Sequence, residues 1–174
     1  MYRLNVKSNF RDINFWIIII IFLVTVNLST AIYLGRLNLN FTIFSIRFPH
    51  LLGIIGASFV SIFTPIFYIL KRRNIKLYKQ LLRLHMFGNV ISLLMISMHE
   101  TFRFVRLPLG LGFTLYILLL LLVLSGFSFK FNLLKPFRLY IKNVPHYNRF
   151  FHVSLTISFY LVFIIHLINV LGYV

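Results

Sequence analysis

The chain has 174 residues, of which 60% are hydrophobic and only 11% are charged. A soluble domain of this length is about a quarter charged, so this composition, with a mean hydropathy of +0.92, indicates a protein that lies in lipid. The net charge of +16 could suggest nucleic-acid binding, but the basic residues lie in short segments between apolar runs, as they do in membrane proteins. We therefore expect membrane lipid, and no nucleic acid, among the partners.

Five apolar runs follow one another along the chain and predict five transmembrane helices. They cover residues 15–34, 51–70, 84–105, 107–129 and 150–174. Each run is about long enough to cross a ~30 Å hydrocarbon core, the third only marginally. Pro65 lies in the second half of the second run, where we expect a kink. The predicted fold class is an all-α integral membrane protein, a single domain over residues 1–174 that forms a five-transmembrane-helix bundle.

The distribution of basic residues predicts how the chain is oriented. Fourteen of the 18 lysines and arginines lie in the N-terminal segment and in the loops after the second and fourth runs. The other side carries four, namely Arg36, Arg47, Arg103 and Arg106. The positive-inside rule therefore places the N-terminus inside and the C-terminus outside. The membrane is expected to be a prokaryotic plasma membrane or an organellar inner membrane.

Four histidines in the third and fifth runs form the most informative pattern. His85 and His99 are 14 residues apart in the third run, and His152 and His166 are 14 residues apart in the fifth. On an α-helix, 14 residues turn through about 1400°, within about 40° of whole turns, and rise about 21 Å. Each pair is therefore expected to project from one face of its helix at two depths.

Helices three and five run in the same direction across the membrane, so the two pairs can be matched by depth. A basic residue shortly before His85 and another before His152 place these two near the inside, and His99 and His166 then match near the outside. Neutral imidazole is a good axial ligand for haem iron, and a bis-histidine site has no open position for oxygen. The sequence predicts two b-type haems between helices three and five, with these four histidines as iron ligands.

Other interpretations of the histidines stay open. A single histidine in a membrane helix could bond across helices or line a proton path. Four histidines could also bind zinc or copper, but the ligands of one metal lie within a few ångströms of each other, and the two-depth spacing argues against a single site. The chain has no cysteine, which excludes disulfides, cysteine-ligated iron–sulfur clusters and covalent haem attachment on this chain.

The two H-x13-H spacings resemble the membrane domain of the ferric reductase and NADPH oxidase family. In that family, helices three and five also carry two haems. The segments Arg83-Leu84-His85 and Arg149-Phe150-Phe151-His152 are similar in style to such cytochromes. The spacings also resemble cytochrome b of quinol–cytochrome c reductases, which uses its second and fourth helices in a longer chain. The resemblance covers residues 50–174. The chain departs from the first family by having five spans rather than six and no flavin or nucleotide domain, which puts an NAD(P)H-dependent activity of its own in doubt.

Four further residues are candidates for binding the haems. Gly112 and Gly126 in the fourth run are also 14 residues apart, and small residues there would let a porphyrin approach the backbone at both depths. Ordinary small-residue helix packing is the alternative. Arg83 and Arg149, close to the inner histidines, could pair with haem propionates. Each of them could equally be a topogenic charge.

Three polar residues near the ends of the runs have weaker signals. His50 opens the second run and His146 lies in the loop before the fifth, and either could serve a quinone or a proton path. Glu100, beside His99, could accept protons, or it could be a simple interfacial carboxylate.

Together these features predict a di-haem b-type cytochrome subunit that carries electrons across the membrane within a larger oxidoreductase or respiratory complex. Its partners would be a flavoprotein, an iron–sulfur protein or another redox subunit. One alternative is a cytochrome b subunit that reacts with quinol or quinone. Another is a structural or transport subunit that holds no haem.

Overall fold

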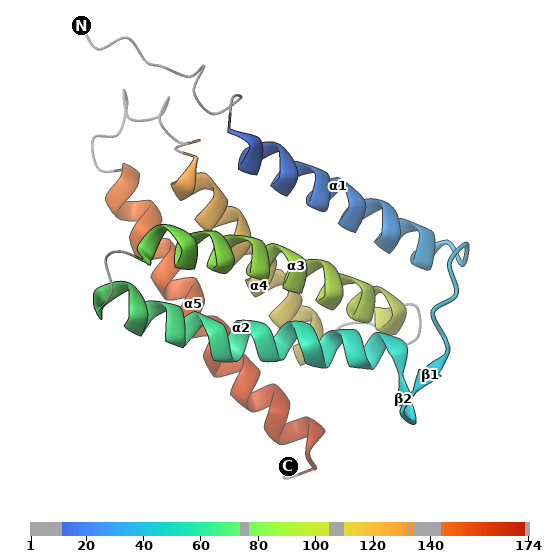
Figure 1. The fold of residues 1–174 in the computed structure, drawn as a ribbon. Coiled ribbons are helices and arrows are strands. Elements are labelled where there is room, and N and C mark those ends of the chain that lie inside the picture. The colour runs from blue at the N-terminus through green and yellow to red at the C-terminus, as the bar shows by residue number, and fades with distance from the viewer. Residues whose placement is uncertain (1–11, 74–76, 105–109, 132, 134–143, 173–174) are drawn as a thin grey trace, which may run out of the picture.

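The computed structural model describes residues 12–73, 77–104, 110–131, 133 and 144–172 (Figure 1). This part of the chain contains five long helices and one short hairpin. The elements in chain order are α1 (Ile13–Tyr33), β1 (Thr42–Ile43), β2 (Ile46–Arg47), α2 (Phe48–Arg73), α3 (Tyr78–Phe104), α4 (Leu111–Lys130) and α5 (Val144–Val170). All five helices are long and apolar enough to cross a membrane. This confirms the prediction of an all-α bundle with five helices that are long and apolar enough to span a membrane.

The helices extend beyond the apolar runs at several ends. Helix α3 begins at Tyr78 and α5 at Val144, each six residues before the predicted start of its run. Backbone hydrogen bonding of a helix can extend into the polar and basic residues that flank an apolar run. The length of the run therefore underestimates the length of the helix. Helix α4 begins at Leu111, with Gly110 as its N-cap, and the start predicted at residue 107 lies outside the described residues.

Close backbone packing joins α2 to α3, α4 to α5, α1 to α3 and α3 to α4. In Figure 1, α1, α3 and α2 run side by side in front, and α4 and α5 cross behind them. Successive helices alternate in direction. The N-terminal ends of α1, α3 and α5 therefore lie on one side, which we call the basic end. The opposite side carries the β1–β2 hairpin, and we call it the hairpin end.

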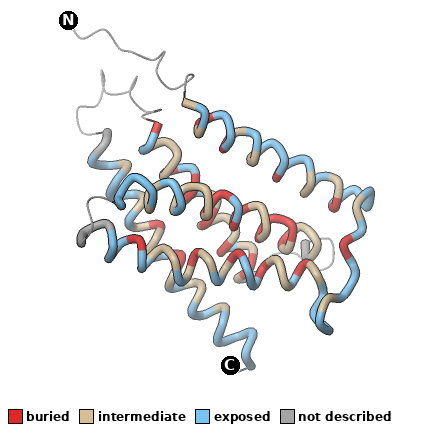
Figure 2. Tube along the Cα trace, viewed as in Figure 1, coloured by how far each residue is buried: buried red, intermediate tan, exposed pale blue. Residues whose placement is uncertain are grey.

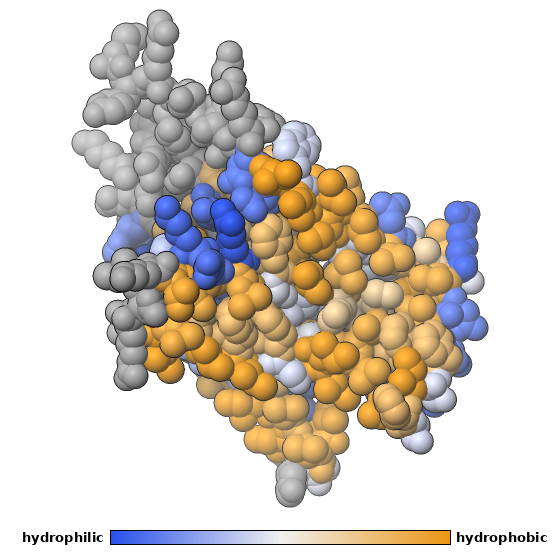
Figure 3. Space-filling model, in the orientation of Figure 1, coloured by the Kyte–Doolittle hydropathy of each residue, from blue (hydrophilic) through white to orange (hydrophobic). Residues whose placement is uncertain are grey.

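The buried core is small compared with the apolar surface. Leu93 of α3 and Leu119 of α4 are among its most buried side chains, while much of α1 and α5 is exposed (Figure 2). Figure 3 shows an apolar belt across the middle of the face in view, with hydrophilic patches toward both ends. Four basic residues at the basic end are exposed, namely Lys79, Arg83, Lys130 and Arg149. This distribution is that of an integral membrane protein whose apolar belt contacts lipid.

Glycines allow α2 and α3 to approach each other closely. A Cβ built on Gly56 of α2 would lie 3.0 Å from the carbonyl oxygen of Ser92 and 3.0 Å from the side chain of Ile96 in α3. On the α3 side, a Cβ on Gly88 would overlap the ring of Phe59. Small residues at such contacts are typical of helix pairs in membranes, where van der Waals packing drives association.

A two-stranded hairpin connects α1 to α2 at the hairpin end. Thr42 pairs with Arg47, and Ile43 pairs with Ile46 in an antiparallel register. The turn residues Phe44 and Ser45 both have positive φ angles, 50° and 66°. The sequence analysis missed this hairpin because the Asn-Gly or Asp-Gly pair that usually marks such a turn is not there.

Candidate functional site

His99 lies near the end of α3 and is held against the start of α2. Its Nδ1 is 3.1 Å from the carbonyl oxygen of Pro49. A Cβ built on Gly53 would lie only 2.8 Å from Cγ of His99, so the imidazole occupies the space that a larger residue at position 53 would need. The ring of His50 meets that of His99 edge-on, with 5.0 Å between the ring centroids.

His152 lies near the start of α5 and is held by α4. Its Nδ1 is 2.8 Å from the hydroxyl oxygen of Ser125, and that hydroxyl is also 2.9 Å from the carbonyl oxygen of Leu122. A Cβ built on Gly126 would lie 3.2 Å from Cε1 of His152. The structure therefore brings together two residues that the sequence analysis selected separately, Gly126 and His152.

The partners of these two histidines are compatible with one and the same tautomer of the neutral imidazole. The Pro49 carbonyl can only accept a hydrogen bond, so Nδ1 of His99 is the donor. The Ser125 hydroxyl can donate to the Leu122 carbonyl while its oxygen accepts from Nδ1 of His152, so this contact is compatible with the same tautomer. In both rings the lone pair is then on Nε2. This is the tautomer that a histidine adopts when Nε2 ligates a metal and Nδ1–H is fixed by a second group.

His85 lies toward the basic end of α3 and also faces α2. Its ring stacks on that of Phe67, with 4.3 Å between the centroids and 9° between the planes. The side-chain nitrogen of Asn89, one turn along α3, is 3.4 Å from both ring nitrogens of His85, which is too long for a strong hydrogen bond. Asn89 is 5% exposed, and its side-chain oxygen accepts no hydrogen bond from the described residues.

None of the contacts named above joins a histidine of α3 to a histidine of α5. His166 is half-buried in the C-terminal third of α5. In the part of the chain that the structure describes, no three histidine or acidic side chains come together as a metal-binding group. The pairing of His85 with His152 and of His99 with His166 therefore stays a prediction.

The other predicted haem-binding residues are divided between the interior and the surface. Gly112 is buried in the first turn of α4. Arg83 of α3 and Arg149 of α5 are exposed at the basic end. Among the residues with weaker signals, His50 and His146 are exposed.

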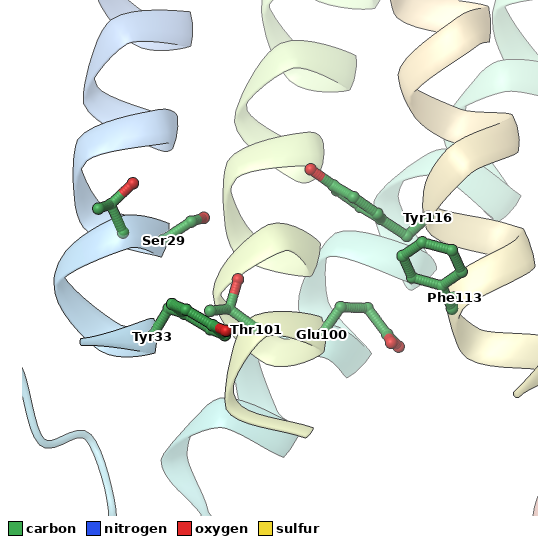
Figure 4. A pocket seen from close by; sticks show the side chains of 7 residues that line it. Ser29, Tyr33, Glu100, Thr101, Phe113 and Tyr116 are labelled. Atoms are coloured by element: carbon green, nitrogen blue, oxygen red, sulfur yellow. The ribbon is translucent and has the colours of Figure 1, made fainter. Parts of the chain in front are cut away.

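Glu100 lies inside the bundle. It is only 8% exposed, and its carboxylate oxygen is 3.8 Å from Nε2 of His99. Figure 4 shows it in a pocket at the hairpin end, where its side chain points from α3 toward Phe113 of α4.

Sequence reasoning missed the residues that hold the histidines. Ser125 and Pro49 come from helices distant in sequence from the rings that they contact. Phe67 resembles any other apolar residue of α2. A weak signal was available for Ser125, because it begins a Ser-Gly step directly after the unbroken apolar stretch of residues 117–124.

Comparisons of the chain with known protein families, with curated protein sequences and with solved structures give no match.

Proposed function

We propose that this chain is a di-haem b-type cytochrome subunit that carries electrons across a membrane, with His85, His99, His152 and His166 as the axial ligands. One observation carries the proposal. His99 of α3 and His152 of α5 each place Nδ1 against an oxygen that can accept its hydrogen, the arrangement that leaves the lone pair on Nε2 for a metal.

The packing of the helices supports the same proposal. A planar macrocycle that is ligated from both sides needs space between the ligating helices. Helices α3 and α5 are not among the closely packed helix pairs of the described chain, whereas each of them packs against α4. Gly126 of α4 leaves room beside His152 where a larger side chain would press on the ring. Imidazole donors suit haem iron, and the lack of close backbone packing between α3 and α5 is consistent with a cofactor between them.

Bound haem would supply one-electron redox chemistry at its iron, and two haems at different depths would let electrons cross the bilayer. The residues of the chain fix the geometry of this chemistry. Pro49 and Ser125 orient the imidazoles and increase the electron density on Nε2. Two histidines per iron leave no open position for oxygen, which favours electron transfer over oxygen binding.

The chain would work as one subunit of a larger redox complex. Its described residues contain no site that we can assign to an electron donor, so a flavoprotein, an iron–sulfur protein or another redox subunit would supply or accept the electrons. The exposed basic residues of α3, α4 and α5 favour an inside position for the basic end, in a prokaryotic plasma membrane or an organellar inner membrane.

The test is a dithionite-reduced-minus-oxidised spectrum with pyridine haemochrome quantitation on the purified protein. We expect two b-type haems per chain in the wild type and about one in His99→Ala. His146→Ala, which removes an exposed histidine, is the matched control and should retain both haems. A folded wild-type protein without a Soret band would overturn the proposal and leave a structural or transport subunit as the leading account.

A further inference from the structure

The β1–β2 hairpin is amphipathic. Successive side chains of a strand point to opposite faces of a sheet, and residues that pair across two strands share a face. Thr42 and Arg47 pair with each other and form the polar face, where both are exposed. The opposite face is entirely apolar and consists of Phe41, Ile43, Ile46 and Phe48. Because a two-stranded hairpin is only marginally stable in water by itself, this apolar face needs a surface to pack against.

The bundle covers the apolar face of the hairpin only at its base. Phe48 packs against a buried cluster that includes Met98 of α3. The ring of Phe48 stacks on that of Phe41 at 4.6 Å, and its backbone N–H donates to the Phe41 carbonyl at 2.8 Å. Farther from this base, Phe41 is still 47% exposed and Ile46 is 39% exposed. The outer part of the apolar face is therefore uncovered by the described residues.

The turn of the hairpin carries a large apolar side chain that the bundle does not bury. Phe44 is 92% exposed. Its φ angle of 50° is one that bulky residues rarely adopt, and Ser45 follows at 66°. Two-residue turns of this kind usually contain asparagine or glycine. A residue that suits the turn poorly thus holds an aromatic ring outside the bundle, and backbone positions of this kind are concentrated at functional sites.

The position of the turn indicates what surrounds this ring. In Figure 1, the hairpin lies across the end of the bundle, and its turn extends sideways past the start of α2, away from α1 and α3. Within the first two turns of α2, Ile54 and Ile55 are exposed on a candidate span. The uncovered face of the hairpin therefore continues the surface of the bundle that faces lipid.

We propose that the hairpin lies on the lipid surface and anchors the bundle there, with the ring of Phe44 inserted between headgroups and acyl chains. Amphipathic elements that lie in a membrane interface bury their apolar face about 5–10 Å into this boundary. Thr42, Ser45 and Arg47 then stay in contact with water and headgroups, where the guanidinium suits lipid phosphates. Because β2 leads directly into α2, the anchor holds the start of that helix at a fixed depth. The inference does not depend on the proposed haems.

Tryptophan fluorescence tests this position directly, because the chain has a single tryptophan, Trp16. In a Trp16→Phe background, Phe44→Trp places the reporter in the turn, and Thr42→Trp places it on the polar face as the matched control. Each full-length variant is reconstituted into phosphatidylcholine nanodiscs, which leave both membrane surfaces accessible. One quencher is phosphatidylcholine brominated near the headgroup end of its acyl chains, and the other is aqueous iodide.

We expect brominated lipid to quench the reporter at position 44 and iodide to leave it largely unquenched, with the reverse result at position 42. Equal quenching by iodide at both positions would place the turn in water and overturn the proposal. A reporter at position 44 that neither quencher reaches would also overturn it, because protein, such as a second copy of the chain, would then cover the ring.

A second variant separates a lipid contact from a purely local role of the turn. Asparagine adopts positive φ angles more readily than phenylalanine, so Phe44→Asn should stabilise the hairpin if only the turn matters. If lipid holds the ring, its loss should instead speed hydrogen exchange of the Phe48 amide, which donates to Phe41, about ten-fold in nanodiscs. Unchanged or slower exchange would overturn the proposal, and this measurement decides the question if Phe44→Trp does not fold.

Discussion

The Nδ1 atom of His152 lies 2.8 Å from the Ser125 hydroxyl oxygen, across the interface between α5 and α4. Because the hydroxyl can donate its hydrogen to the Leu122 carbonyl, its oxygen can accept the hydrogen of Nδ1. We predict that Ser125→Ala leaves two haems per chain but releases one of them about ten-fold faster, because the loss of such an outer contact weakens metal binding ten- to a hundred-fold. Haem transfer to excess apomyoglobin measures the release.

Two further variants serve as controls for this prediction. Ser125→Thr keeps the hydroxyl and should restore slow release, whereas Ser158→Ala removes an exposed hydroxyl of α5 and should have no effect. An unchanged release rate in Ser125→Ala would show that the Ser125 contact does not orient an iron ligand.

Two glycines that face histidines should differ in their tolerance of a methyl group. A Cβ on Gly53 would lie 2.8 Å from Cγ of His99, a distance at which one of the two must move, while a Cβ on Gly126 would lie 3.2 Å from Cε1 of His152. We therefore predict that Gly53→Ala lowers haem content from two to about one per chain. Gly126→Ala should retain more haem than Gly53→Ala.

Pyridine haemochrome quantitation measures both glycine variants, with Ser58→Ala on the exposed face of α2 as the control. Full haem content in Gly53→Ala, together with an unchanged spectrum, would contradict a ligand role for His99.

The five helices were predictable because each apolar run is long enough to span a bilayer and polar loops separate the runs. The helix ends were less predictable, as at Tyr78 and Val144, since hydropathy reports the surrounding solvent rather than backbone hydrogen bonding. The hairpin turn was not predictable, because Phe44 and Ser45 are unusual residues for positive φ angles. Only tertiary contacts can select such a turn against its local preference.

For the candidate site, the 14-residue spacing identified His85 and His99 as residues of one helical face, but the structure packs that face against α2, whereas the predicted haems lie between α3 and α5. Helical periodicity is a local property, so one helix is enough to read it. The groups that orient the rings could not be identified from the sequence, because Pro49 and Ser125 contact their histidines only in the packed bundle. Burial of Glu100 was missed for the same reason.

The chain lacks cysteine, so single introduced cysteines can test its orientation. We predict that Ser45→Cys, in the turn at the hairpin end, reacts with a membrane-impermeant maleimide in intact cells. Gln80→Cys, exposed in the first turn of α3 at the basic end, should react only after permeabilisation. The basis is the excess of lysine and arginine at the basic end. The reverse labelling pattern would place the N-terminus outside.

A last prediction concerns the contact between α5 and the turn of α2 that precedes Pro65. Pro65 has no N–H, so the Ser61 carbonyl loses its usual partner within the helix. The Tyr160 hydroxyl of α5 lies 3.4 Å from that carbonyl oxygen and donates to the Val60 carbonyl at 3.0 Å. Neighbouring helices often satisfy groups that a proline exposes in a membrane. We expect Tyr160→Phe to lower the free energy of unfolding by about 1 kcal/mol in detergent-denaturation experiments.

A double-mutant cycle with Pro65→Ala tests the cause of this effect. Alanine restores the N–H to α2 and lets Ser61 bond within its own helix, so Tyr160→Phe should cost less in the Pro65→Ala background than in the wild type. An equal cost in both backgrounds would mean that the Tyr160 hydroxyl stabilises the bundle independently of the proline. In that case its bond to Val60 would hold α5 against α2, and Pro65 would have no part in positioning the helix that carries His152 and His166.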